Sequence, residues 1–132
     1  MQHTIIEVPG PHDTAIARVT EALAEEGFGV ITRIDMHDTF QAKLDVTIPP
    51  YTILGACNPA LAHKAVTAAP EVGLLLPCNV TVEDTGSGSL VRIPDAREML
   101  GGAGISEESG TLAELAEDAG NRLERVVVAL QG

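Results

Sequence analysis

The sequence contains very few aromatic side chains. Of its 132 residues only Phe28, Phe40 and Tyr51 are aromatic (2%) and none is tryptophan, although 45% of the residues are hydrophobic. A core of this composition must be aliphatic, and it offers few rings on which bases or sugars can stack. The length is that of one domain with a sizeable core, so we expect a single domain over residues 1–132.

Basic residues are also scarce. Lysine and arginine number 8 against 19 aspartates and glutamates, which gives a formal net charge of −11. A protein that binds nucleic acid needs a positive surface to displace counterions from phosphates, and an anionic membrane attracts the same kind of surface. The composition therefore argues against both partners, and the acidity is explained by solubility.

Long hydrophobic runs and export signals are missing as well. No apolar run approaches the ~20 residues of a membrane span. The opening MQHTIIEVPG has neither a basic start nor the apolar stretch of a signal peptide. The two cysteines are then expected to be free thiols, as in most cytosolic proteins. We predict a soluble cytoplasmic protein that does not interact with membranes.

The periodicity of apolar residues predicts a mixture of strands and helices. We expect strands at 3–8, 28–35, 51–57 and 89–93, and one long strand or a kinked pair of strands at 72–84. Helices are expected at 14–26, 38–44, 59–69 and 111–130, with a tight turn at 85–88 and a short turn from Asp95 to the flexible connector GGAG at 101–104. This order predicts an α+β fold, a two-layer sandwich with a mixed sheet, a βαβ crossover and a C-terminal hairpin followed by a helix.

The dipeptide Cys-Asn occurs twice, at Cys57-Asn58 and at Cys78-Asn79. If strand 51–57, helix 59–69 and strand 72–82 form a βαβ unit, the two strands are parallel. Cys57 then lies at the upper end of the first strand, and the strand rise brings Cys78 back to the same height. We therefore expect the two motifs to share one rim of the sheet, where ligands tend to bind.

These four residues, Cys57, Asn58, Cys78 and Asn79, form the candidate binding site. Cys57 precedes a helix N-terminus, whose partial positive charge favours a thiolate, and the two asparagines are suited to orienting a polar ligand. A purely structural explanation is also available. Small buried cysteines are ordinary core residues, and Asn58 followed by Pro59 is a common way to begin a helix.

Other patterns are less informative. Two cysteines without a C-x-x-C pair are a poor match to a zinc site, and His63 is expected to face solvent, so we predict no metal site. Asp35 and His37 lie on one side of a strand end, as an acid–base pair would, but strand ends are usually polar. GGAG lacks the lysine and the flanking strand of a phosphate-binding loop.

Two blocks, EEGFGVITRIDMHDTFQAKL (25–44) and YTILGACNPALAHKAVTAAPEVGLLLPCNVTV (51–82), closely resemble the DUF302 family of small bacterial and archaeal proteins. The resemblance covers about two-thirds of the chain. It implies a TT1751-like α+β fold, with helices packed on a sheet, and assembly as a homodimer, and it carries no assignment of an enzyme activity either way. The family pattern usually has a glycine after Lys-Leu, where this chain has Asp45.

Two hypotheses about function remain open. The first is a non-catalytic small-molecule-binding or regulatory homodimer, with a site at the two Cys-Asn motifs and an aliphatic interior suited to a modest pocket. The alternative is a thiol-dependent enzyme or redox protein that uses Cys57 as nucleophile and Cys78 as resolving partner. The sequence assigns no reaction, cofactor or ligand.

Overall fold

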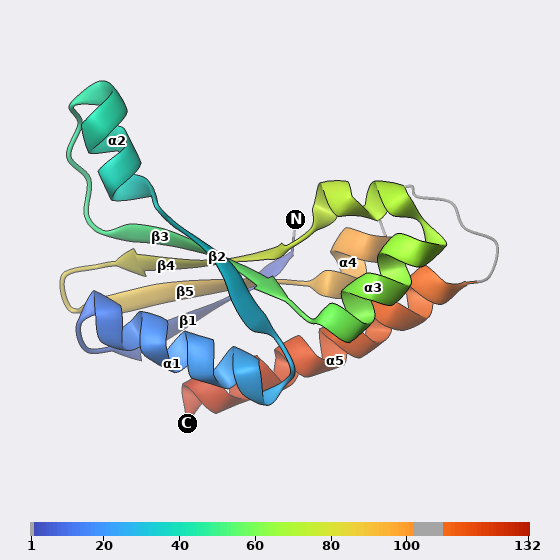
Figure 1. The fold of residues 1–132 in the computed structure, drawn as a ribbon. Coiled ribbons are helices and arrows are strands. Elements are labelled where there is room, and N and C mark those ends of the chain that lie inside the picture. The colour runs from blue at the N-terminus through green and yellow to red at the C-terminus, as the bar shows by residue number, and fades with distance from the viewer. Residues whose placement is uncertain (1, 102–109) are drawn as a thin grey trace.

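The computed structural model describes residues 2–101 and 110–132. Its elements are β1 (His3–Pro9), α1 (His12–Glu25), β2 (Gly29–Asp35), α2 (Met36–Leu44), β3 (Tyr51–Cys57), α3 (Pro59–Ala68), the 3-10 helix η1 (Pro70–Leu75), β4 (Cys78–Asp84), β5 (Gly88–Pro94), α4 (Ala96–Gly101) and α5 (Thr111–Gln131). The strands form one sheet in the order β1-β5-β4-β3-β2 (Figure 1). The predicted α+β class is confirmed. The expected connector at 101–104 lies, beyond Gly101, outside the described residues.

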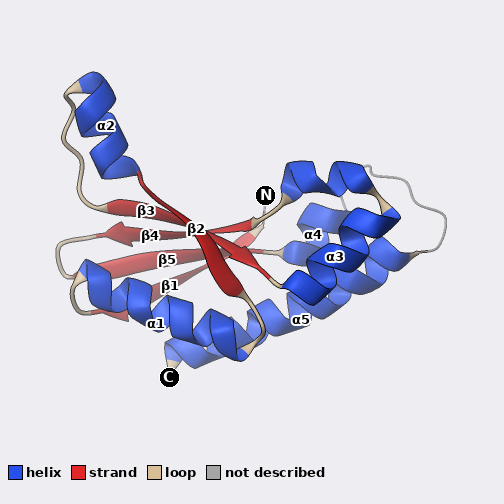
Figure 2. Ribbon diagram, viewed as in Figure 1, coloured by secondary structure: helices blue, strands red, loops and turns tan. Residues whose placement is uncertain are grey.

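Helices α1 and α5 cover one face of the sheet, as Figure 2 shows. The predicted periodicity of α5 is confirmed, because its apolar stripe is buried: Leu112, Leu115, Ala119, Leu123, Val126 and Leu130. Val126 meets Val19 and Leu23 of α1 in one core cluster with the inward-facing valines of β4 and β5. This layer is aliphatic, as the composition predicts, and Phe28 is its one aromatic residue.

The expected parallel crossover is wrong, because β3 and β4 pair antiparallel and so do the other neighbours in the sheet. A parallel pair would require the intervening helix to lie along the sheet. Helix α3 does not lie along the sheet, but packs on α5 and η1 beyond the end of the strands (Figure 1). The chain therefore turns round at this end and re-enters the sheet in the opposite direction.

The strand expected at 72–84 is half as long as predicted. Its second half is β4, but its first half belongs to η1 and the connection that follows it. Pro70 begins η1, and Pro77 has no N–H to give to a ladder, so regular pairing starts at Cys78. The run Leu74-Leu75-Leu76 suggested a strand interior, whereas Leu74 is 90% exposed.

The sequence predicts the ends of helices more accurately than the path and length of the strands. Gly27 ends α1 with φ +84°, and the Phe28 amide returns to the Leu23 carbonyl at 2.9 Å. Asp95 accepts the Arg97 amide at 2.9 Å at the start of α4. Asp45 ends α2 in the left-handed region (φ 53°), which is the conformation that the usual glycine of the family pattern adopts without strain.

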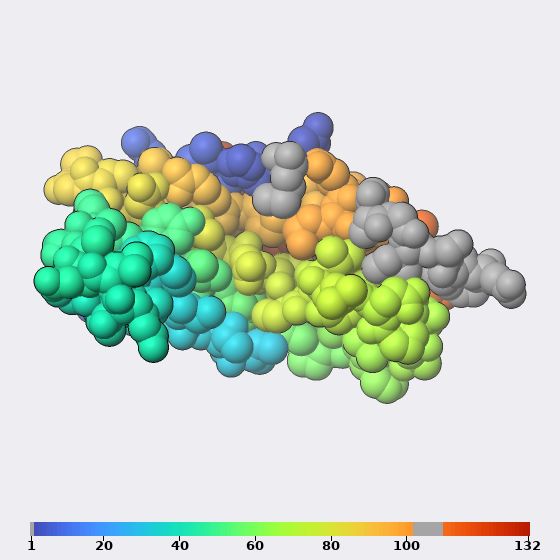
Figure 3. All heavy atoms as spheres, turned by 90° about the horizontal axis from the view of Figure 1, so that it is seen from above, coloured from blue at the N-terminus to red at the C-terminus, as the bar shows by residue number. Residues whose placement is uncertain are grey.

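On the other face of the sheet, no helix layer is formed by residues 2–101 and 110–132. The strand register places Ile34, Ile53, Thr81, Arg92 and Ile5 in one row across it. Figure 3 views this face, with α2 at one end and α3 and η1 at the other. None of the nine residues of α2 is buried, and the helix rises away from the sheet (Figure 1).

Candidate functional site

The two Cys-Asn motifs meet at one end of the sheet, although not through a crossover. Cys57 is the last residue of β3 and Cys78 is the first residue of β4. The antiparallel register places Ala56 opposite Cys78, so both cysteines lie at the same rim. Cys57 and Cys78 therefore lie close together, as expected, although the chain connects them by a different path from the one predicted.

Both sulfurs border a small cavity between the sheet end and the helices. Its volume is about 40 Å³, and its walls are Phe28, Ala56, Cys57, Asn58, Leu61, Ala62, Ala65, Leu76, Pro77, Cys78, Leu100, Leu115 and Ala119. Apart from the two thiols, Asn58 is the one side chain in this wall with a polar atom. The site is therefore an apolar space with a sulfur-lined edge.

Asn58 is engaged in structure. Its Oδ1 accepts the Leu61 amide at 3.3 Å, which confirms it as the N-cap of α3. Its Nδ2 donates to the Glu26 carbonyl at 3.5 Å, and Arg122 donates to that same carbonyl at 3.0 Å. Asn58 thus joins the start of α3 to the end of α1, and both its oxygen and its nitrogen are engaged in structure.

Asn79 is separated from the other three residues. Side chains alternate between the faces of a strand, and Cys78, Val80 and Val82 are buried while Asn79 is exposed. Asn79 lines a different depression, formed with Leu74, Pro77 and other residues on the uncovered side. The structure thus brings Cys57, Asn58 and Cys78 to one cavity and leaves Asn79 outside it.

The two thiols differ in their surroundings. Both cysteines are free; Cys78 is buried and Cys57 is partly exposed. Burial raises the pKa of the Cys78 thiol, because a thiolate is poorly solvated there, and the neighbouring Cys57 raises it further. Cys78 is therefore held in its protonated form.

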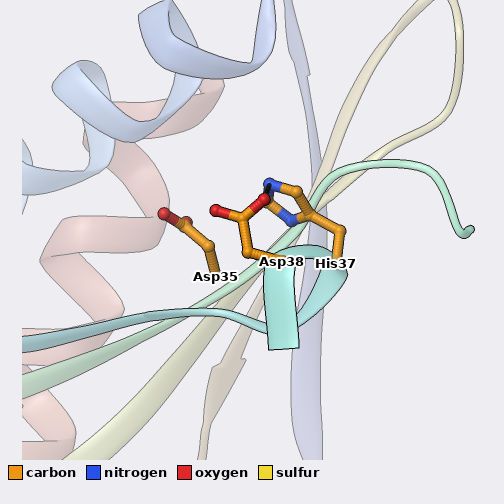
Figure 4. A group of neighbouring side chains, drawn as sticks. All are labelled: Asp35, His37 and Asp38. Atoms are coloured by element: carbon orange, nitrogen blue, oxygen red, sulfur yellow. Dashed lines mark ion pairs between the residues drawn. The ribbon is translucent and has the colours of Figure 1, made fainter. Parts of the chain in front are cut away.

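A second cluster of polar side chains lies at the opposite end of β3, around the start of α2. The nearest ligand atoms of Asp35, His37 and Asp38 all lie within 4.8 Å of one another (Figure 4). The sequence singled out Asp35 and His37, and the structure adds Asp38 one residue further along. His37 Nε2 lies 3.8 Å from the Asp38 carboxylate.

This cluster is continuous with a buried chain of hydrogen bonds. The Thr52 hydroxyl donates to Asp35 at 2.8 Å, so the Thr52 oxygen accepts from His12 Nε2 at 2.9 Å. His12 and Thr52 were missed from the sequence. A threonine inside an apolar strand gives no signal, and His12 lies 23 residues before Asp35.

The surroundings shift two pKa values in this chain of hydrogen bonds. Burial lowers the pKa of His12, and the positive charge of Arg33 adds to the effect. For Asp35, burial by itself favours the protonated acid, but the hydrogen bonds from Thr52 and Arg33 outweigh it and lower the pKa. At neutral pH an ionised Asp35 therefore lies close to a neutral His12.

Comparison with known families identifies the chain. The family model described as "Domain of unknown function DUF302" matches residues 4–130. The chain belongs to the DUF302 family. No curated protein matches it.

The DUF302 fold is also found among solved structures. The crystal structure of an uncharacterized conserved DUF302 protein from Bacillus stearothermophilus has a TM-score of 0.83 and 27% identity, with 98% of each chain covered. Within the described residues of this DUF302 domain, no helix is long and apolar enough to cross a membrane. Family and fold are thus established, and function must be argued from the two ends of the sheet.

Proposed function

We propose that the chain is a non-catalytic small-molecule-binding or regulatory domain, whose ligand enters the cavity bordered by Cys57, Asn58 and Cys78. The observation that carries this proposal is the cavity itself, an apolar space at which Cys57, Asn58 and Cys78 converge from two separate segments of the chain. Ligand sites are typically concave and mainly apolar, with a few polar atoms that fix orientation. A cytoplasmic location belongs to the same proposal.

The size of the cavity limits what enters it. A volume of about 40 Å³ accommodates roughly three water-sized groups, whereas drug-sized ligands occupy several hundred Å³. The ligand, or the part of it that is buried, is therefore a short apolar group. This is smaller and less polar than the ligand expected from the sequence, since Asn79 lies outside and Asn58 already caps α3.

The test is to fill the cavity. Ala62 lines it and Ala68 belongs to the same helix but does not, so Ala62→Leu and Ala68→Leu form a matched pair. A thermal-shift and native mass spectrometry screen of small metabolites should find compounds that stabilise wild type and Ala68→Leu but not Ala62→Leu. Asn79→Ala should behave as wild type. If every stabilising compound acts equally on Ala62→Leu, the cavity is not the site.

A thiol-dependent enzyme or redox protein is the second candidate, because Cys57 and Cys78 border the same cavity. The raised pKa of Cys78 weighs against this candidate, since a buried protonated thiol is a poor nucleophile. Measuring the rate of Cys57 alkylation as a function of pH tests this second candidate. A midpoint near the free-thiol value of ~8.5 would remove the hypothesis, whereas a midpoint well below it would support a reactive thiolate.

The proposal includes assembly as a homodimer, which is supported by α2 and the strand beside it. An isolated helix as short as α2 is marginal in water, and none of its side chains is buried within the chain. Leu44 is 65% exposed and Ile31 of the edge strand β2 is 62% exposed. In a dimer with two-fold symmetry, the same surface of each copy covers both exposed side chains of the other copy.

Light scattering after size exclusion tests the assembly. Wild type should elute as a dimer, and Leu44→Asp should shift it toward the monomer. Leu74→Asp is the matched control, because Leu74 is still more exposed but lies on η1, beyond the other end of the sheet. A monomeric wild type, or a dimer that Leu44→Asp leaves intact, would overturn this part of the proposal.

A further inference from the structure

We propose that Asp35, His37 and Asp38 bind a divalent transition-metal ion, with Zn²⁺ as the first choice. The three side chains offer two carboxylate oxygens and one imidazole nitrogen within 4.8 Å of one another (Figure 4). One nitrogen and two oxygens around an open position is a donor set that zinc accepts. This site is independent of the cavity at Cys57 and Cys78.

The position of Asp35 excludes its simplest structural role. It is the N-cap residue of α2, where an aspartate normally accepts a hydrogen bond from the first turn of the helix. Its side chain makes no such bond. The carboxylate instead turns toward Thr52, which donates to Oδ1 at 2.8 Å, and toward Arg33, which donates to Oδ1 at 3.2 Å. No hydrogen bond to Oδ2 is recorded within the described residues.

The contacts behind the ligands match those that support metal ligands in proteins. A ligating carboxylate is usually held by a hydrogen bond, and a ligating histidine usually donates its second N–H to a carbonyl or carboxylate. Thr52, which is fully buried, fixes Asp35 in this way and is itself held by His12. The ligand closest to the sheet is therefore positioned before any ion arrives.

His37 is held differently, because its Nδ1 is an acceptor from the backbone of Tyr51. Its Nδ1 accepts the Tyr51 amide at 3.0 Å and lies 3.2 Å from the Tyr51 carbonyl oxygen. In the neutral ring that accepts from the amide, the proton is on Nε2. When a metal ion binds Nε2, the proton moves to Nδ1, which then gives up the hydrogen bond from the Tyr51 amide and donates to the Tyr51 carbonyl after a small shift of the ring.

The local charge also favours a cation. Asp13 and Asp84 act on His12 electrostatically, and they add two carboxylates to those of Asp35 and Asp38. Arg33 pairs with Asp13 at 3.8 Å and with Asp35 at 3.2 Å. The neighbourhood of His12 and α2 therefore holds four carboxylates and one guanidinium, an excess of negative charge that attracts positive ions. The imidazole selects transition metals over Mg²⁺, which prefers oxygen ligands.

The experiment is a calorimetric titration of the metal-free full chain with ZnCl₂ and, separately, MgCl₂, combined with ¹⁵N spectra of the histidine rings. We expect one Zn²⁺ per chain, a shift of the His37 Nε2 signal, and Mg²⁺ binding at least tenfold weaker. His37→Gln and Asp38→Asn should each weaken Zn²⁺ binding at least tenfold. His63→Gln, which removes an exposed histidine on α3, should change nothing.

Asp38→Asn keeps the test decisive if His37→Gln perturbs folding, because the Asp38 side chain is 80% exposed. Failure to bind Zn²⁺ would overturn the proposal. So would binding that survives both substitutions and disappears in Cys57→Ser, since the ion would then belong to the thiols. Neither result bears on ligand binding in the apolar cavity.

Discussion

At one end of the sheet, Cys57 and Cys78 border a small apolar cavity, whereas at the other end Asp35, His37 and Asp38 lie around the start of α2. The first end is held by packing of α3 and α4 against α5. The second end is held by directed hydrogen bonds that run through one buried threonine. The two ends should therefore respond differently to loss of volume, to loss of a polar atom and to pH.

The largest effect is expected at the apolar end. Leu115→Ala removes a buried side chain from the cavity wall and should lower the free energy of unfolding by about 2–4 kcal/mol, through lost burial and an enlarged cavity. Leu74→Ala, at a side chain that is 90% exposed, should change it by less than about 0.5 kcal/mol. Urea denaturation measures both. Equal effects would show that this end is not stabilised by packing.

At the polar end, Thr52→Val preserves shape and removes one hydroxyl. His12 Nε2 and Asp35 both lose a partner, so unfolding should become easier by about 1–3 kcal/mol. Thr81→Val is the matched control, because the buried Thr81 hydroxyl has no hydrogen-bond partner among the described residues. That variant should be neutral or slightly stabilising. Equal losses in the free energy of unfolding in Thr52→Val and Thr81→Val would contradict this expectation.

A smaller effect is expected at Asp45, where α2 ends. Asp45→Ala places alanine in the left-handed region and should lower the local stability of α2 by about 1 kcal/mol, while Asp45→Gly should change it by less than about 0.5 kcal/mol. Hydrogen exchange of the α2 amides is the measurement, because a helix at the molecular surface can open without global unfolding. Faster exchange in both variants would point to the lost Gln41 hydrogen bond instead.

The sequence predicts the local features of this molecule better than its long-range features. Gly27, Asn58 and the stripe of α5 were predictable, because each depends on neighbours within a few residues. The direction of β4 was not, because it depends on α3 packing on α5, a helix far along the chain, and not on the sheet.

The candidate sites follow the same division. Cys57 and Cys78 were placed together correctly from the wrong topology, since either direction of β4 returns the chain to the same rim. The link from Thr52 to His12 joins segments 40 residues apart, and no local pattern marks it.

The smallest expected effects concern pH, and the two ends should lose stability in opposite directions. His12 is partnered by Thr52 and lies near Asp84, Asp13, His37 and Arg33. Its pKa in the folded chain is below the ordinary value of 6.5. The unfolded chain therefore takes up a proton first as the pH falls, and stability decreases from 6.5 down through the folded pKa. His12→Gln should flatten this acid limb.

Cys78 should act on the alkaline side. Burial keeps its proton bound above the ordinary thiol pKa of 9.0, so the unfolded chain loses that proton first as the pH rises. The free energy of unfolding then decreases from pH 9.0 upward until the folded thiol also ionises. Comparing urea midpoints of wild type and Cys78→Ala across this range removes the contribution of residues common to both. The difference in urea midpoint between wild type and Cys78→Ala should narrow as the pH rises, because alanine has no proton to lose. Parallel curves would mean that Cys78 ionises equally in both states, and the apolar end would then be more open to water than its packing indicates.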